Sequence, residues 1–356
     1  IGLSGLCLKT DMTEKQRDYI SKVNGSARAL LGIINDILDF SKIEAGKMDI
    51  EHIPFSLEEV MDNLATVVTQ KASEKGLEVL FWAEPDVPDA LVGDPLRVGQ
   101  ILVNLANNAI KFTEKGEIVV RIETVEKNEN DALLQLSVRD TGIGLTEEQQ
   151  GRLFQAFSQA DMSTSRKYGG TGLGLTISKS LAEGMGGEIW VESEADVGST
   201  FSFTIRCGLR EESKRDLSQA FDPADIPTLI VDNNTTAQQI LVKIMGSIGF
   251  PVEAVDSGQA GLDELGRAAS AGAPYRLGLM DWNMPEMDGI ETARRIKGDT
   301  NLEPSPAIFL VSAFSRDEMI VQAAKLGLEG VLSKPINPSV LVDTLMNTFG
   351  DGQTPG

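Results

Sequence analysis

The sequence is short of cysteine, of basic residues and of long apolar runs, and each shortage excludes a class of protein. Cys7 and Cys207 are far apart and form no metal-type spacing, so we expect two reduced thiols. No apolar run approaches the ~20 residues that span a bilayer, and no signal peptide opens the chain. Lys and Arg number 32 against 53 Asp and Glu, and the net charge of -21 argues against broad nucleic-acid binding. We therefore expect a cytoplasmic chain, or the cytosolic part of an anchored one, with no nucleic acid and no membrane contact of its own.

Length and composition predict a multidomain globular protein. With 356 residues, of which 41% are hydrophobic and 24% charged, the chain can form two or three domains that each bury a core. It begins without Met, at Ile1 and in the middle of an apolar pattern, which suggests a piece of something longer.

Residues 1–50 predict a helical hairpin. Residues 10–13 break the pattern, and Thr13 is a plausible N-cap for the helix that follows. Apolar residues then repeat at alternating spacings of three and four, and the stripe is too wide for one hairpin to bury. We expect a homodimer in which two hairpins form a four-helix bundle; packing on the chain's own next domain is the alternative. The repeat comprises Ile20, Val23, Ala27, Leu30, Ile34, Ile37 and Ser41, widened by Leu31 and Leu38.

Residues 51–207 mix helical and alternating patterns, which predicts an α+β sandwich. Helices are expected at 56–74 and 96–112. The expected strands are 117–122, 133–139, 188–193 and 200–206.

A doubly wound α/β domain is predicted for residues 227–349, because short apolar runs alternate there with helical stretches. Residues 208–226 are polar and read as a linker, and residues 350–356 form a Gly-rich tail. The expected parallel strands are 228–231, 277–280, 307–311 and 330–332, with a weaker one at 251–255.

Three segments of residues 51–207 fit a single nucleotide, although each alone also fits a solvated helix face, a turn or a loop. Asn104, Asn108 and Lys111 share one helix face, where amide oxygens suit Mg²⁺ and the lysine suits phosphate. Asp140 ends a strand, and its carboxylate could accept a hydrogen bond from the amino group of adenine. Backbone can approach a ligand closely at Gly142 and Gly144, and a later glycine-rich loop enters a helix, as phosphate cradles do. That loop contains Gly170, Thr171, Gly172, Leu173 and Gly174.

The order of these segments resembles the Bergerat-type ATP-binding domain of histidine kinases. Residues 104–111 match its N box, 140–144 and 170–175 its two Gly boxes, 153–157 its F box and 198–201 its last strand motif. The resemblance implies ATP and Mg²⁺ as cofactors. Under it Asn108, supported by Asn104, holds Mg²⁺, Lys111 meets the phosphates and Asp140 binds adenine. Further ligands implied are Arg166 and Lys167 in a lid at 158–168, and Thr200 in the last motif.

The histidine that this resemblance requires is absent. Residues 31–48 resemble the second helix of a dimerisation and phosphotransfer domain, and residues 1–11 resemble the end of the first. The phosphoacceptor histidine would then lie about three helical turns before Ile1. His52 is the sole histidine and matches a connector, so it is not the expected acceptor. The chain is predicted to bind ATP without phosphorylating itself.

Residues 227–349 resemble a response-regulator receiver with the flavodoxin-like strand order. Asp232, Asp281, Ser312 and Lys334 each follow or end a predicted strand, so all four should meet at one edge of the sheet. The resemblance implies that Asp281 accepts the phosphoryl group, that Lys334 neutralises its charge and that Ser312 hydrogen-bonds the product. Mg²⁺ would be held by Asp232, Asp281 and Asn283.

Two positions depart from the receiver pattern. Asn233 stands where a second carboxylate is expected, which predicts weaker Mg²⁺ binding. Val331 replaces a common Tyr or Phe, so aromatic switching is not expected.

Taken together, these features predict a hybrid histidine kinase of two-component signalling. Phosphate would pass from ATP to an upstream histidine, then to Asp281, and onward to a phosphotransfer protein or a response regulator. The alternatives are a regulatory receiver that is weakly or never phosphorylated on a kinase core, a non-kinase Bergerat ATPase and a silent interaction module.

Overall fold

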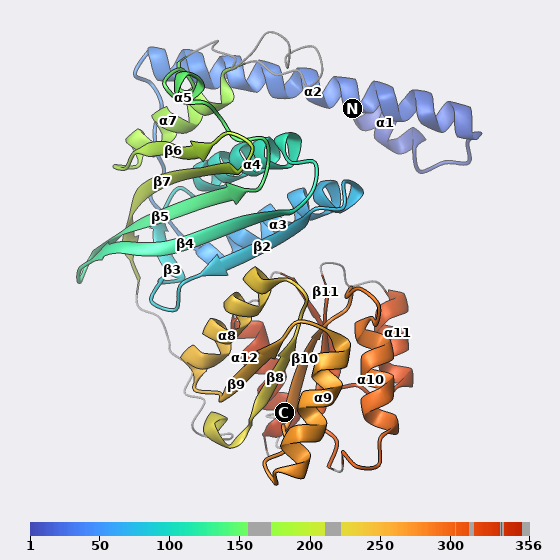
Figure 1. The fold of residues 1–356 in the computed structure, drawn as a ribbon. Helices are drawn as coiled ribbons and strands as arrows, with labels where there is room; N and C mark the ends of the chain where they lie inside the picture. Colours follow the sequence, from blue (N-terminus) through green and yellow to red (C-terminus); the bar gives the residue numbers. More distant parts are fainter. Residues whose placement is uncertain are drawn as a thin grey trace, which may run out of the picture.

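Two sheets and a long helical arm make up the protein (Figure 1). A computed structural model describes residues 1–155, 172–210, 222–302, 304–312, 317–334, 336 and 338–350. None of the helices in these ranges is both long and apolar enough to cross a membrane.

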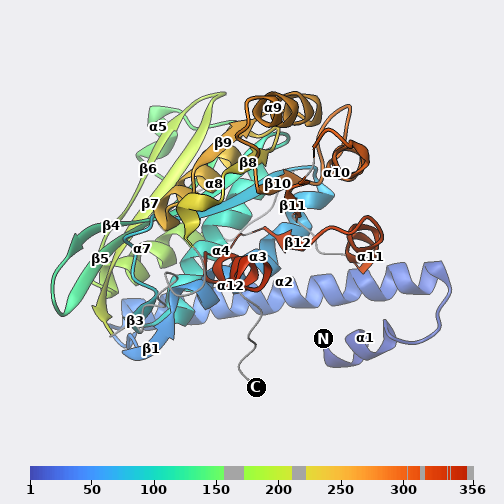
Figure 2. The ribbon, with the colours of Figure 1, turned by 90° about the horizontal axis from the view of Figure 1, so that it is seen from below.

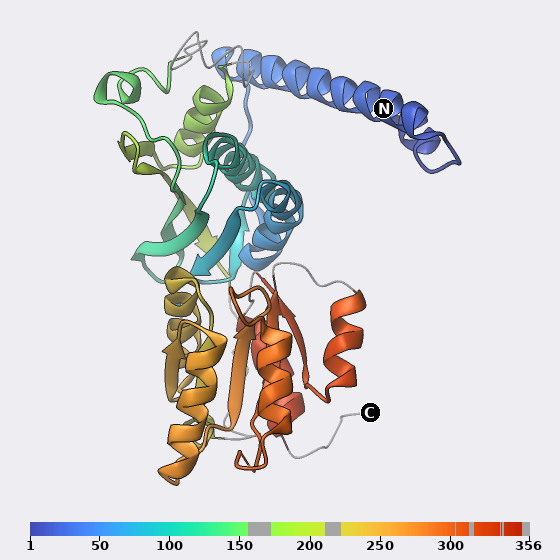
Figure 3. The ribbon, with the colours of Figure 1, turned by 45° about the vertical axis from the view of Figure 1, so that its right-hand side comes forward.

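The arm consists of α1 (Gly2–Cys7) and α2 (Glu14–Glu44), as the helical hairpin prediction required. Thr13 caps α2: its hydroxyl accepts from the backbone of Gln16, whose side chain in turn accepts from the Thr13 backbone. Phe40 and Ile43 pack against the core of the first sheet, whereas the N-terminal half of α2 extends past both sheets (Figures 2 and 3). Most of the apolar stripe of α2 stays exposed between Val23 and Leu38, with Leu30 58% accessible.

The first sheet has seven strands in the order β1-β3-β7-β5-β4-β2, with β6 paired to β7. The four predicted strands are confirmed, but β1, β2 and β3 were missed. β1 and β3 are four residues long, and β2 is a nearly continuous buried run without polar alternation. The bounds are β1 Ile53–Ser56, β2 Glu78–Ala83, β3 Ala90–Gly93, β4 Glu117–Lys127, β5 Asp131–Asp140, β6 Ile189–Glu194 and β7 Gly198–Leu209.

Helices cover one face of this sheet, and the opposite face points toward the second sheet and its helices (Figure 1). α3 (Leu57–Glu74) and α4 (Pro95–Phe112) confirm the two predicted helices, and α7 (Gly174–Gly184) and the single turn α5 (Glu147–Gln150) follow. Ile101, Leu102 and Phe203 are fully buried between helices and sheet. Because strand residues alternate between faces, the side chains of Leu80 and Val119 point away from these helices.

The second sheet is parallel, in the order β12-β11-β10-β8-β9, which confirms the flavodoxin-like prediction. Helices lie on both of its faces, as near-continuous apolar strands require. Strand bounds are β8 Thr228–Val231, β9 Val252–Val255, β10 Leu277–Asp281, β11 Ala307–Ser312 and β12 Gly330–Ser333. Helix bounds are α8 Thr235–Ile248, α9 Gly258–Ser270, α10 Gly289–Gly298, α11 Asp317–Lys325 and α12 Pro338–Phe349.

The two sheets meet at a seam, which we define by Leu80 and Val119 of the first sheet and Ile240 and Ile244 of α8. All four are buried and belong to one apolar cluster with the core of the second sheet. Figures 1 and 3 show α8 directly below β2 and β4. The open face of the first sheet is therefore covered by the receiver-like half of the chain.

Candidate functional site

The helix α4, which carries the first predicted polar face, is capped at its N-terminus. Asp94 caps the N-terminus by accepting from the Arg97 backbone at 3.0 Å, and Pro95 opens the first turn. Further along, Asn104, Asn108 and Lys111 are all half-buried. These three side chains are therefore partly accessible on α4.

Asn104 joins α4 to the start of α7. Its amide nitrogen donates to the Ser178 hydroxyl at 3.0 Å. A Cβ at Gly174 would lie 2.6 Å from the Asn104 side-chain oxygen, so a larger residue there would displace the Asn104 amide. Leu173 beside it is buried, and Gly172 has a φ of +71°, where glycine is favoured. The predicted ligands Arg166, Lys167, Gly170 and Thr171 lie outside the described residues.

Asp140 is a buried carboxylate at the carboxyl end of β5, between β4 and β7. Its Oδ1 accepts from the Gly142 backbone at 2.8 Å. Burial raises the pKa of Asp140, and hydrogen bonds from the Gly142 and Ser199 backbones oppose that rise. The carboxylate therefore has a fixed orientation, which recognition of one base edge needs.

Glycines bring the loop after Asp140 into close contact with two neighbours. A Cβ at Gly142 would lie 2.6 Å from the Phe112 carbonyl oxygen, at the end of α4. Gly144 has a φ of +62°, and a Cβ there would lie 1.9 Å from the Glu194 carbonyl oxygen. The end of β5 is thereby joined to α4, and Thr200 pairs with Arg139 one position away from Asp140.

Lys111 ends this face in a partly desolvated position. Its ammonium lies 4.8 Å from the centre of the Phe112 ring, and burial lowers its pKa. The structure thus brings the N-box face, Asp140 and the start of α7 together. These groups suit a nucleotide and its metal. They are two side-chain amides, one carboxylate, one ammonium and a loop whose glycines let a ligand come close to the backbone.

The second predicted cluster also comes together, at the carboxyl ends of β8, β10, β11 and β12. Asp232, Asp281 and Ser312 are buried there. The Lys334 ammonium lies 2.7 Å from Asp281 Oδ1 and 3.0 Å from Asp232 Oδ2. Two carboxylates that converge on one positive charge are a donor set suited to a cation.

Backbone hydrogen bonds orient both carboxylates. Asp281 accepts from the Asn283 backbone at 2.9 Å, and Asp232 accepts from the Asn234 backbone at 2.8 Å. Burial raises the pKa of Asp232 to about 6 against the opposing charge of Lys334. Burial alone would lower the pKa of Lys334, but the nearby carboxylates raise it.

The remaining predicted receiver positions lie around this pair. The side chains of Asn233 and Asn283 are exposed beside it. The Ser312 hydroxyl contacts the Met319 sulfur at 3.7 Å. Val331 is half-buried on β12, three residues before Lys334.

Residues of the first sheet also enter this cluster, and the sequence did not predict them. Glu78 Oε1 lies 3.1 Å from the Lys334 ammonium. The Asn234 amide donates to Glu78 at 2.8 Å and to Glu117 at 2.9 Å, and the Thr236 hydroxyl donates to Glu117 at 2.9 Å. The sequence does contain one indication of this contact, since a glutamate begins each of the adjacent strands β2 and β4. It could be used only once β2 had been recognised as a strand.

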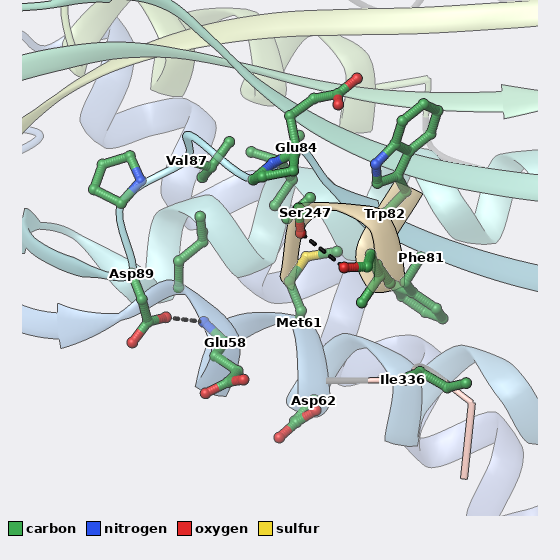
Figure 4. A pocket seen from close by; sticks show the side chains of 16 residues that line it. Glu58, Met61, Asp62, Phe81, Trp82, Glu84, Val87, Asp89, Ser247 and Ile336 are labelled. Carbon is green, nitrogen blue, oxygen red and sulfur yellow. Dashed lines mark hydrogen bonds between the residues drawn. The ribbon is translucent and has the colours of Figure 1, made fainter. Parts of the chain in front are cut away.

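At the other end of the seam the two halves enclose a cavity of about 270 Å³ (Figure 4). Met61, Phe81 and Trp82 line it from the first half, and Ile244 and Ile336 from the second. The Lys243 ammonium lies 4.2 Å from the centre of the Trp82 ring. Because both halves line the cavity, it exists only while they are docked.

Three families match successive parts of the chain. Residues 1–46 match the His Kinase A (phospho-acceptor) domain. Residues 93–209 match the histidine kinase-, DNA gyrase B-, and HSP90-like ATPases. Residues 228–346 match the response regulator receiver domain. This combination does not favour a non-kinase ATPase or a silent module.

Two curated relatives contain similar sequence. Signal transduction histidine-protein kinase BarA of Escherichia coli (strain K12) is 49% identical over 209 residues, which are 59% of this chain and 23% of BarA. Sensor histidine kinase GacS of Pseudomonas protegens is 40% identical over 307 residues, which are 81% of this chain and 33% of GacS. The chain spans less than two thirds of the length of either relative.

A solved structure shares the fold. The crystal structure of full-length ShkA in complex with AMPPNP gives a TM-score of 0.72 at 24% identity, covering 99% of this chain and 69% of that one.

Proposed function

Because this chain belongs to the hybrid histidine kinases, we propose that it binds ATP on the α4 face and passes the γ-phosphate through an upstream histidine to Asp281. The proposal rests on one observation above all: Asp281 and Lys334 lie 2.7 Å apart in the same chain as an oriented, buried Asp140. The pair of Asp281 and Lys334 suits a phosphoryl group, and Asp140 suits the amino group of adenine.

At the nucleotide, each group has a separate task. The Asp140 carboxylate accepts a hydrogen bond from the adenine amino group, while the backbone N–H groups of Gly142 and Ser199 keep that carboxylate in place. Lys111 meets the phosphates, and Asn108 with Asn104 would hold Mg²⁺. Bound Mg²⁺ neutralises charge on the phosphates. The relative ShkA was crystallised with AMPPNP, which supports a nucleotide here.

In the receiver, an Asp281 oxygen attacks the phosphorus of the phosphohistidine. The new O–P bond forms as the P–N bond breaks, and the imidazole leaves with the electron pair of that bond. Lys334 neutralises the transferred group, and Ser312 hydrogen-bonds it. Mg²⁺ would be held by Asp232, Asp281 and Asn283, where carboxylates already converge on a positive charge.

The partners follow from the exposed surfaces. Two copies would pair through the bare apolar stripe of α2 and complete a four-helix bundle. Phosphate would continue from Asp281 to a phosphotransfer protein or a response regulator, in the cytoplasm where ATP is available.

A labelling experiment tests the relay. The chain extended with its upstream histidine segment is incubated with Mg²⁺ and labelled ATP, beside the same protein carrying Asp281→Asn. We expect label on both, with acid-labile, alkali-stable phosphate accumulating in the variant. If the bound phosphate has the same acid and alkali stability and the same amount in both proteins, transfer to Asp281 is ruled out. No label despite measurable ATP binding would rule out the kinase.

Asn233→Asp should raise the rate at which a small phosphodonor phosphorylates the receiver, on the order of tenfold, because an added carboxylate strengthens Mg²⁺ binding. The rate is measured at limiting Mg²⁺. Asn301→Asp, exposed at the opposite end of the sheet, is the charge-matched control and should change nothing. An unchanged rate in Asn233→Asp would show that the missing carboxylate is not limiting.

A further inference from the structure

The receiver docks on the first sheet with its phosphoacceptor edge facing inward. Leu80 is 4% and Val119 6% exposed, although both point away from the helices of their own domain. Polar contacts flank this apolar patch: Asn234 with Glu78 and Glu117 at one end, and Lys243 over Trp82 at the other. The docked surface therefore borders the site where phosphate should arrive.

Glu78 extends across the seam into that site. The Lys334 ammonium lies among three carboxylates, those of Asp281 at 2.7 Å, Asp232 at 3.0 Å and Glu78 at 3.1 Å. The first two belong to the receiver, whereas Glu78 belongs to the ATP-binding half. Its side chain is held there by the Asn234 amide at 2.8 Å.

A phosphoryl group on Asp281 needs the same surroundings. Its oxygens must reach the Lys334 ammonium, the cation that neutralises them, and Glu78 already occupies one side of that ammonium. Adding a phosphoryl group would place further negative charge beside the Glu78 carboxylate in a buried site, where like charges repel strongly. Glu117 contacts the same Asn234 but is paired with Arg139, so the repulsion comes from the Glu78 carboxylate.

We infer that Glu78 gates phosphorylation of Asp281: its carboxylate takes the place of phosphoryl oxygen beside Lys334 while the receiver is docked, so docking and phosphorylation exclude one another. The inference rests on the proposed phosphoacceptor role of Asp281. By linkage, docking lowers the equilibrium constant for phosphorylation of Asp281 by the same factor by which phosphorylation weakens docking. A phosphorylated receiver thus leaves the sheet and becomes available to a downstream partner.

The test uses this chain, a small phosphodonor and Mg²⁺, without ATP and without any histidine donor. Glu78→Gln keeps the size of the side chain and removes its charge. It should be phosphorylated on Asp281 at least about fivefold faster than the unaltered chain. Glu129→Gln, on the exposed turn between β4 and β5, makes the same change of charge and should leave the rate unchanged.

A second variant distinguishes the effect of the Glu78 carboxylate from the effect of burying Asp281 in the seam. Leu80→Glu places a charge in the seam without entering the receiver site, so it should open the seam and raise the rate as well. If Leu80→Glu is faster but Glu78→Gln is not, burial alone limits the reaction and the gate is overturned. Equal rates in all variants overturn it too. Thermal unfolding of each variant confirms that it is folded.

Shape provides an independent readout. Loading Asp281 with beryllofluoride, which mimics a phosphoryl group, should increase the radius of gyration in small-angle scattering. A loaded chain that stays compact would overturn the gate. Failure of ATP labelling in the extended chain would instead count against the kinase alone, since this assay uses neither ATP nor histidine.

Discussion

Replacing Asp140 by Asn is expected to weaken ATP binding about tenfold to a hundredfold and to abolish the preference for ATP over GTP. The Gly142 and Ser199 backbones donate to Asp140, so the amide of an Asn would keep its oxygen toward these two N–H groups and turn its NH₂ toward the base. That NH₂ opposes the amino group of adenine but can donate to the carbonyl of guanine. Calorimetric titration with both nucleotides measures the change.

Asp131→Asn is the matched control, because Asp131 begins the same strand that Asp140 ends. Its carboxylate accepts from Arg206 at 2.6 Å on the surface, away from the nucleotide face. The control should bind both nucleotides as the unaltered chain does. Should Asp140→Asn keep its preference for ATP, Asp140 would not be the residue that reads the base.

Gly144→Ala is expected to destabilise the chain by about 3 kcal/mol or more and to abolish ATP binding. The added Cβ would lie 1.9 Å from the Glu194 carbonyl oxygen, and the φ of +62° disfavours any L side chain. The loop must then move, and Asp140 begins that loop. Thermal unfolding and nucleotide titration report the two effects.

Gly76→Ala separates backbone strain from the steric clash. Gly76 has a φ of +70°, but a Cβ there would meet no atom within 4 Å. It should cost only about 1–2 kcal/mol and leave ATP binding intact. Equal losses of stability in the two variants would show that the contact with Glu194 does not matter.

The sequence predicted those parts of the fold and site that depend on local patterns. Each of these parts can be predicted from a few neighbouring residues. They are the Gly box after Asp140, the N-cap Thr13, and the strand ends at Asp232 and Asp281. The strand Glu78–Ala83 was missed because helices cover one of its faces and the receiver covers the other, so it lacks the polar alternation of a half-exposed strand.

The contact of Glu78 with Lys334 could not be predicted from the sequence. The two residues are 256 positions apart, and their meeting depends on how two separately folded sheets dock. Asn233 indicated that the receiver was short of a carboxylate, but nothing local indicated that another half of the chain supplies one nearby. Docking is decided by the fit of two finished surfaces, which no short window of residues describes.

The covered face of the first sheet also sets a limit on how this protein can be divided. A fragment ending before residue 211 would keep every nucleotide box yet present Leu80, Trp82 and Val119 to water. These residues lie on β2, an edge strand with unpaired backbone groups, and on its neighbour β4. A bare apolar face beside an open edge favours self-association. An isolated ATP-binding fragment would therefore be prone to aggregate unless polar residues replaced Leu80 and Val119.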